Sequence, residues 1–200
     1  MPDGARIFST MGESVPELDI RLRKTVVLIG MMGAGKTAVG RALAARLGVQ
    51  MCDSDAEIVE RSRLTIAEIF ERYGEAFFRE KETQIIARLL EGPPCILSTG
   101  GGAWMSERNR RILTEKAAVL WLEADLDLLW SRVRHKTTRP LLRTDDPHRT
   151  LSDILKERTP VYRLAPLKVH VEPDWSIAET AERVLERLVA AGAVERIEGK

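Results

Sequence analysis

A glycine-rich segment at residues 30–37, G-M-M-G-A-G-K-T, has the residue types needed to bind the phosphates of a nucleotide. It fits the pattern G-x-x-x-x-G-K-[ST] and follows the apolar run at residues 26–29, as a strand–loop–helix unit requires. Glycines let successive backbone N–H groups point into one concavity, and the N-terminus of the following helix adds positive potential. Lys36 would reach the β- and γ-phosphates, and Thr37 would place its hydroxyl on Mg²⁺. The pattern predicts a nucleoside triphosphate site, which kinases, ATPases, GTPases and ATP-gated regulators all share.

Two carboxylates, Asp53 and Asp55, follow the second short apolar run at residues 49–52. We expect them at the carboxyl edge of a parallel sheet, where such sheets bind ligands. One carboxylate can order hydrated magnesium, while the other can accept a hydrogen bond from a substrate hydroxyl. Aspartate is also a preferred helix N-cap, so the pair alone indicates function and capping equally.

The segment S-T-G-G-G at residues 98–102 follows the apolar run at residues 95–97. Three successive glycines leave a sheet edge without side chains, so that a ligand can reach backbone N–H groups directly. A flexible loop would have the same sequence. No acidic residue ends this run, although a magnesium carboxylate is often found there; Asp53 is the candidate that would replace it.

Two arginines, Arg79 and Arg158, lie in amphipathic segments and are candidates for binding an acidic substrate. A planar guanidinium can bind a carboxylate through two hydrogen bonds. Glu82 follows Arg79 by three residues, which places both on one helix face, and it could hold the arginine in position. Taken singly, each arginine would more often be a surface charge.

Residues 135–147 are polar and basic and interrupt two helical patterns. A segment of this kind can close over a site and exclude water from a reacting phosphoryl group. We therefore predict a mobile lid here, with Arg139 as its functional residue. A passive surface loop is the alternative.

Short apolar runs alternate with helical segments along most of the chain. The helix after the phosphate loop ends at Gly48, a capping box starts another at Thr65, and a longer one occupies about residues 75–90. A last helix occupies about residues 177–188. Strands separated by helices favour right-handed crossovers and a buried parallel sheet. We predict a three-layer α/β/α sandwich with a central five-stranded parallel sheet; its strands lie at residues 26–29, 49–52, 95–97, 117–122 and 167–171.

The composition predicts a single globular domain. The chain has 200 residues and a net charge of +1, so nothing favours nucleic acid or anionic membranes as partners. Cys52 and Cys95 lie in apolar runs without metal-ligand spacing, which fits buried thiols in the reducing cytoplasm. No stretch reaches the ~20 apolar residues of a membrane span. We expect a polar, partly disordered extension at residues 1–23 and a monomeric domain at residues 24–200.

Taken together, these motifs resemble those of the shikimate kinase family over residues 24–190. They occur in the family's order and at closely similar spacing: the phosphate loop, D-S-D at 53–55, G-E-x-x-F-R-x-x-E at 74–82, S-T-G-G-G at 98–102, R-P-L-L at 139–142 and E-R-x-P-x-Y at 157–162. Trp104 and Glu80 depart from the family's usual residues, which are a smaller aliphatic residue and a basic residue. Both departures could change substrate affinity.

The resemblance implies a role for each site residue. Asp53 would order magnesium through water, and Asp55 would bind the shikimate hydroxyls and is the candidate catalytic base. Arg79 and Arg158 would bind the shikimate carboxylate, Arg139 would neutralise the transferring phosphoryl group, and Arg132 would stack on adenine. Residues 172–176 would form the adenine-binding loop. The remaining shikimate contacts would come from Gly100, Gly101 and Gly102, and those to ATP from Gly33, Ala34, Gly35, Lys36, Thr37 and Ala38.

The resemblance also implies the reaction. The γ-phosphoryl group of ATP would pass to the 3-hydroxyl of shikimate, on the route to chorismate and the aromatic amino acids. Two other classes stay open: a kinase for another small hydroxy-acid such as gluconate, and a non-catalytic ATP-binding regulator. A regulator would be expected to lack Asp55, Arg79 or Arg139, and all three are present. A GTPase is excluded because the chain has no N-K-x-D motif.

Overall fold

The computed structural model describes residues 19–135 and 140–197 and contains a central parallel sheet of five strands. The order across the sheet is β3 (Met51–Asp53), β4 (Ile96–Ser98), β2 (Val26–Ile29), β5 (Ala118–Glu123) and β6 (Leu167–His170). The central strand β2 pairs with both neighbours, so that Val27 lies opposite Leu97 on one side and Val119 on the other. The predicted five-stranded parallel sheet is confirmed.

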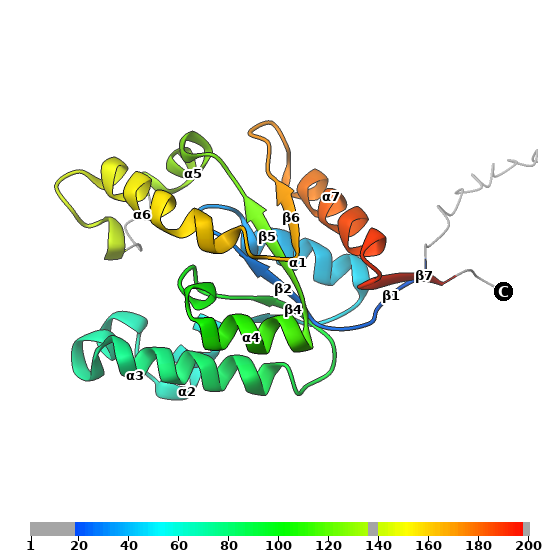
Figure 1. Cartoon of the computed structure of the whole chain (residues 1–200), viewed down its shortest axis with the longest axis horizontal. Coiled ribbons are helices and arrows are strands. Elements are labelled where there is room, and N and C mark those ends of the chain that lie inside the picture. Colours follow the sequence, from blue (N-terminus) through cyan, green and yellow to red (C-terminus); the bar gives the residue numbers. More distant parts are fainter. Residues whose placement is uncertain (1–18, 136–139, 198–200) are drawn as a thin grey trace, which may run out of the picture.

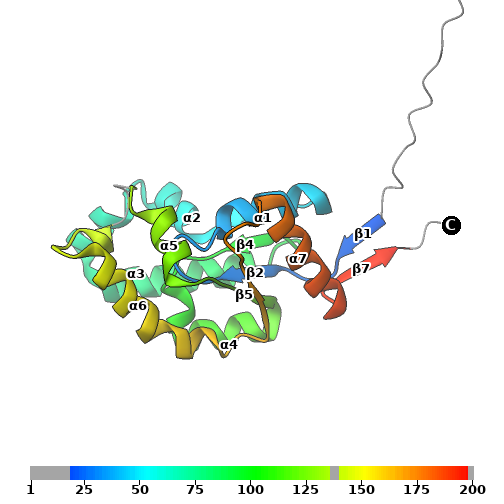
Figure 2. The ribbon, with the colours of Figure 1, turned by 90° about the horizontal axis from the view of Figure 1, so that it is seen from above.

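Helices cover both faces of this sheet, as Figures 1 and 2 show. Helices α1 (Lys36–Leu47) and α7 (Ile177–Ala190) pack against each other on one face. Helix α4 (Glu107–Lys116) packs against β5 on the other face and against α3 (Ile66–Leu89). Three more helices and two short 3-10 helices flank the carboxyl ends of the strands. They are α2 (Ser54–Ser62), α5 (Leu126–Val133), α6 (Pro147–Tyr162), η1 (Ala103–Met105) and η2 (Pro140–Leu142). The architecture is the three-layer sandwich that the alternation of elements predicts.

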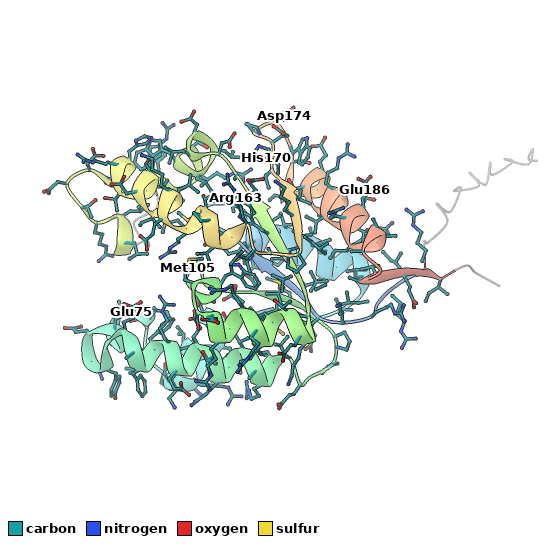
Figure 3. The ribbon with its side chains drawn as sticks, viewed as in Figure 1. Glu75, Met105, Arg163, His170, Asp174 and Glu186 are labelled. Atoms are coloured by element: carbon teal, nitrogen blue, oxygen red, sulfur yellow. The ribbon has the colours of Figure 1, made fainter. Side chains whose placement is uncertain are left out.

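The core consists mainly of the apolar strands and the inward faces of the helices. Leu28, Ile96 and Leu120 are 0% exposed, as expected for a sheet covered on both faces. Cys95 is buried there as a free thiol, and burial together with the nearby Cys52 raises its pKa to about 12. Charged side chains such as Glu75 and Glu186 lie on the outer faces of the helices (Figure 3). Of the helices that the structure describes, none is long and apolar enough to span a bilayer.

Helix α3 has a break that the sequence predicts. Its capping box is formed at Thr65, whose hydroxyl accepts a hydrogen bond from the Glu68 amide at 3.2 Å. Gly74 has non-helical angles (φ 79°, ψ 172°), so the helix consists of two segments that meet at this glycine. This agrees with the separate segments predicted from Thr65 and from about residue 75, and it sets the direction of the segment that carries Arg79.

Two short strands were not expected. β1 (Asp19–Leu22) pairs antiparallel with β7 (Val194–Ile197), and Leu22 and Val194 are buried at 6% and 2% exposure. The end of the segment predicted as an extension over residues 1–23 therefore joins the domain. This pair lies at the opposite end of the molecule from α5 and α6 (Figure 1).

Candidate active site

The predicted phosphate loop connects β2 to α1. Gly30, Gly33 and Gly35 have φ angles of 142°, 86° and 100°, which residues with a side chain rarely adopt. Gly35 is the N-cap of α1 and supplies no side-chain hydrogen bond, so the first amides of the helix remain for a ligand. Lys36 extends back over the loop, and its Nζ donates to the carbonyls of Gly30 at 2.8 Å and Met31 at 3.0 Å. This geometry suits a phosphate group.

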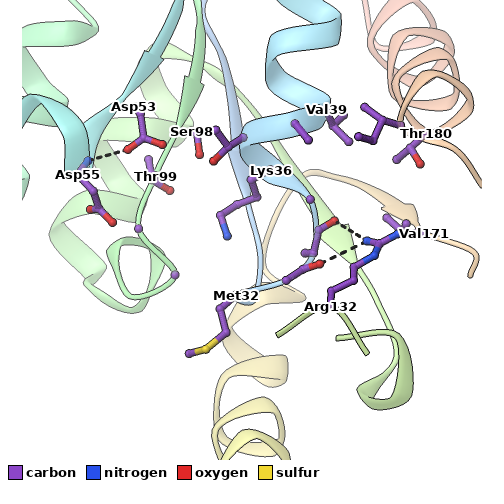
Figure 4. A pocket seen from close by; sticks show the side chains of 18 residues that line it. Met32, Lys36, Val39, Asp53, Asp55, Ser98, Thr99, Arg132, Val171 and Thr180 are labelled. Carbon is purple, nitrogen blue, oxygen red and sulfur yellow. Dashed lines mark hydrogen bonds between the residues drawn. The ribbon is translucent and has the colours of Figure 1, made fainter. Parts of the chain in front are cut away.

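A pocket of about 540 Å³ opens at the carboxyl ends of the strands and brings several predicted segments together. Figure 4 shows Asp53, Asp55 and Thr99 on one side of Lys36 and Arg132 on the other. The lining consists of Met32, Gly33, Ala34, Gly35, Lys36, Thr37, Ala38, Val39, Asp53, Asp55, Ser98, Thr99, Gly100, Gly101, Arg132, Val171, Ile177 and Thr180.

Asp53 caps α2 and lines the pocket at the same time. Its Oδ1 accepts hydrogen bonds from the amides of Asp55 at 3.0 Å and Ala56 at 3.2 Å, so the capping interpretation is correct for this residue. Capping fixes the carboxylate at the pocket wall that Thr37 also lines. Carboxylate and hydroxyl oxygens suit Mg²⁺, which usually keeps several waters and phosphate oxygens as ligands. The residues around the phosphate loop therefore fit magnesium.

Thr99 adds a polar group that sequence reasoning did not single out. Thr99 is 2% exposed and lines the pocket. Its Oγ1 has no hydrogen-bond partner within residues 19–135 and 140–197. A buried hydroxyl of this kind needs a partner, which a ligand or water in the pocket can supply. Its signal in the sequence is its position between the apolar run and the glycines.

The three glycines at residues 100–102 each lie against one predicted acceptor residue. A Cβ atom at Gly100 would be 2.8 Å from Oδ1 of Asp55, and one at Gly102 would be 2.8 Å from Nη2 of Arg79. A Cβ atom at Gly101 would be 3.4 Å from Nη1 of Arg158. The absence of side chains thus lets residues from α2, α3 and α6 converge on a single loop, which we call the acceptor loop.

Arg79 is held in place by two carboxylates. Its Nη1 donates to Oε2 of Glu82 at 3.0 Å, and its Nη2 donates to Oε1 of Glu75 at 3.1 Å. Burial acts to lower the pKa of Arg79, but the charges and hydrogen bonds of Glu82 and Glu75 outweigh it and raise the pKa. Burial raises the pKa of Glu82, and Arg79 opposes that shift. The positioning of Arg79 by Glu82 agrees with the expectation from their spacing.

Arg132 extends from α5 to the phosphate loop. Its Nη1 donates to the carbonyls of Gly33 at 3.3 Å and Ala34 at 3.5 Å, and burial lowers its pKa. The residues that flank the predicted adenine segment, Val171 and Ile177, line the pocket, whereas residues 172–176 do not. Arg132 therefore lies where a nucleotide bound to the phosphate loop could reach it.

Part of the predicted lid lies outside the described residues. This includes Arg139, while His135 and residues 140–147 are described. Turn η2 begins at Pro140 and α6 begins at Pro147, so the lid segment connects α5 to α6. The role of Arg139 stays a prediction.

Two aromatic residues join the acceptor loop to α6, and sequence reasoning missed this function. Tyr162 donates from its hydroxyl to the carbonyl of Gly101 at 2.6 Å, and Trp104 donates from Nε1 to the carbonyl of Val161 at 2.8 Å. Trp104 is 1% exposed and does not line the pocket. Only its unusual residue type drew attention to it in the sequence.

Comparisons with known proteins agree with this geometry. A family model described as shikimate kinase matches residues 32–189. The shikimate kinase of Ruegeria pomeroyi is 59% identical over 167 residues, covering 84% of this chain and 86% of that protein. A structure of shikimate kinase from Acinetobacter baumannii in complex with shikimate is 36% identical, with a TM-score of 0.79, over 84% of this chain and 94% of that one. A gluconokinase structure from Sinorhizobium meliloti is 19% identical, with a TM-score of 0.55, over 86% and 94% of the two chains, and shares the fold alone.

Proposed function

Since the chain belongs to the shikimate kinase family, we propose that it transfers the γ-phosphoryl group of ATP to the 3-hydroxyl of shikimate. The products are ADP and shikimate 3-phosphate. One observation carries the proposal: the acceptor loop, on which Asp55, Arg79 and Arg158 converge, borders the same pocket as the phosphate loop. A nucleotide and a small hydroxy-acid could therefore meet within one site.

The phosphate loop is the ATP site of this proposal. Its open amides and Lys36 would bind the phosphates, and Arg132 would lie beside the base. Mg²⁺ would be held directly by Thr37 and through water by Asp53. When bound, it would neutralise charge on the phosphate oxygens. Arg139 would add positive charge from the lid and would help to exclude water once the lid closes.

The acceptor loop is the shikimate site. Arg79 and Arg158 would bind the carboxylate of shikimate, because guanidinium groups pair with carboxylates through directed hydrogen bonds. Asp55 would accept a hydrogen bond from the 3-hydroxyl, orient it toward the γ-phosphate and receive its proton. Gly100, Gly101 and Gly102 would leave room for the ring. Phosphoryl transfer depends largely on such positioning, which α2, α3 and α6 would provide by presenting these residues to the acceptor loop.

We also propose that the enzyme is a monomer and that it works in the cytoplasm, where ATP is available. Size-exclusion chromatography with light scattering tests the monomer, and a mass near 22.5 kDa is expected.

The experiment for the function is coupled ADP release from the purified protein with Mg-ATP. Shikimate, gluconate, quinate and no acceptor would be compared at equal concentration. Turnover that depends on shikimate is expected, with little above background for the other acids. Turnover that favours gluconate would move the chain to the hydroxy-acid alternative. ATP binding with no acceptor-dependent turnover would favour the regulator.

A further inference from the structure

Tyr162 is buried at the end of α6, four residues after Arg158. Tyr162 is 0% exposed, and its ring stacks on that of Trp121 in β5, with the two ring centroids 5.8 Å apart. The hydroxyl donates to the Gly101 carbonyl at 2.6 Å. Helix α6 packs against η1, which carries the Met105 labelled in Figure 3. Tyr162 therefore has a fixed position beside the acceptor loop.

Arg158 lies at the same point of the loop. Residues four apart share a helix face, and a Cβ atom at Gly101 would be 3.4 Å from Nη1 of Arg158 and 3.7 Å from the Tyr162 hydroxyl. Burial raises the pKa of Tyr162 to about 12, although the charge of the nearby Arg158 acts to lower that pKa. The phenol is thus protonated at neutral pH. It can donate to Gly101 and accept from Arg158 at the same time.

We propose that Tyr162 is a positioning residue: its buried hydroxyl fixes the Arg158 guanidinium beside Gly101. The N–H groups of Arg158 then face the carboxylate of the acceptor in a fixed orientation. This inference rests on the proposed function, which assigns carboxylate binding to Arg158. An arginine held by a rigid neighbour loses less side-chain entropy when a ligand binds. Without the hydroxyl, Arg158 would keep its charge but lose its fixed orientation.

Trp104 provides the matched control. It is buried at the same contact between η1 and α6, and it also donates one hydrogen bond to a backbone carbonyl. Its partner is Val161, so its hydrogen bond joins the two elements without involving the Arg158 side chain. Trp104→Phe therefore reports what loosening this contact does by itself.

The test is a double-mutant cycle with full-length protein. Tyr162→Phe and Trp104→Phe would each be made in the native chain and in Arg158→Ala, and kcat and KM would be measured for shikimate and ATP. Tyr162→Phe is expected to raise the shikimate KM about tenfold, with kcat and the ATP KM within about twofold. In Arg158→Ala the same change should alter the shikimate kcat/KM less than about twofold, because the group it positions is gone. The effect of Trp104→Phe should be the same in both backgrounds.

Each other outcome overturns a specific statement. If Tyr162→Phe has the same effect with and without Arg158, or raises both KM values together, Tyr162 only stabilises the fold and the inference fails. If Arg158→Ala leaves the shikimate KM unchanged, Arg158 does not bind the carboxylate. That result would contradict the role that the proposed function gives to Arg158, whereas an absence of shikimate-dependent turnover in the native chain would contradict the proposed function itself. Unchanged ATP KM and thermal unfolding curves establish that the Phe variant is folded.

Discussion

At the scale of single residues, the acceptor site depends on positions that lack a side chain. The close approaches of Asp55 to Gly100 and of Arg79 to Gly102 leave no room for a Cβ atom. The same glycines keep backbone groups of the loop within reach of a ligand. A methyl group at either position would move a polar side chain away from the site.

Gly102→Ala tests this requirement. The new methyl group would lie 2.8 Å from Nη2 of Arg79, so the guanidinium must shift from its place on the loop. We expect a shikimate KM at least about tenfold higher in steady-state kinetics, with the ATP KM unchanged, as for the loss of a charged hydrogen bond. Gly92→Ala is the control, because its nearest atom would be at an ordinary 3.5 Å. Equal effects of the two changes would contradict the account.

Glu82→Gln tests the positioning of Arg79. The Glu82 side chain is 1% exposed, whereas Glu75, which also contacts Arg79, is 66% exposed. Exposed ion pairs contribute little, so Glu75→Gln should change the shikimate KM less than about twofold. Glu82→Gln should raise it at least about fivefold, since the buried partner orients the arginine. A larger rise in the shikimate KM for Glu75→Gln than for Glu82→Gln would show that burial does not determine which glutamate orients Arg79.

The sequence indicated which residues belong to the site better than it indicated which residues contact one another. The phosphate loop could be predicted almost completely, because backbone angles, lysine and hydroxyl all lie within eight consecutive positions. The pairing of Gly102 with Arg79, or of Gly101 with Arg158, joins residues far apart in the chain. Spacing along the sequence does not determine such contacts, and the contact of Tyr162 with Gly101 was missed for the same reason, although Tyr162 belongs to a motif that was singled out.

At the scale of elements, caps and breaks determine where the site residues lie. The capping box at Thr65 begins α3, and the break at Gly74 turns its second segment toward the acceptor loop. Glu68 accepts from the Thr65 amide at 2.8 Å, and this hydrogen bond is the main cause of the lowered pKa of Glu68. Ionised Glu68 thus stabilises the helix start.

This cap predicts a pH dependence of stability. A lowered pKa means that the stabilisation is present above the unfolded-state value of 4.5 and is lost as the pH falls through the lower folded-state value. Glu68→Ala should therefore lower the Tm by a few degrees at pH 7. The difference from the native protein should shrink as the pH falls below 4.5. Glu71→Ala, at an exposed position of the same helix, is the control in thermal unfolding by circular dichroism. A Tm difference for Glu68→Ala that does not change with pH would contradict the prediction.

Elements with a continuous apolar run or a helical pattern in the sequence were predicted, whereas the short strands β1 and β7 were not. The inner strands of the central sheet, β2, β4 and β5, are nearly all apolar because both faces are covered. β1 and β7 have only four residues each, and two residues of each strand are charged, so their pairing comes from the tertiary fold. Gly48 and Thr65 marked helix ends correctly, since capping depends on local chemistry.

At the scale of the whole molecule, the β1–β7 pair lies away from the pocket and serves stability. Leu22→Ala should lower the free energy of unfolding by about 2–4 kcal/mol, because the side chain is buried at 6% exposure. Ile197→Ala in the paired strand should change it by less than about 0.5 kcal/mol, since Ile197 is 48% exposed. Urea unfolding measures both. A large change in kcat for Leu22→Ala would show that the pair influences the site.

The whole fold brings the phosphate loop and the acceptor loop to one pocket at the carboxyl edge of the sheet, and Asp55 lines that pocket. The most direct measurement is the kcat for shikimate-dependent ADP release by Asp55→Asn compared with the native protein. We predict a fall of at least about 100-fold, as for the loss of a positioned base, with an ATP KM within about twofold of the native value. A variant that retains most of its shikimate-dependent kcat would contradict the assignment of Asp55 and the acceptor site built around it.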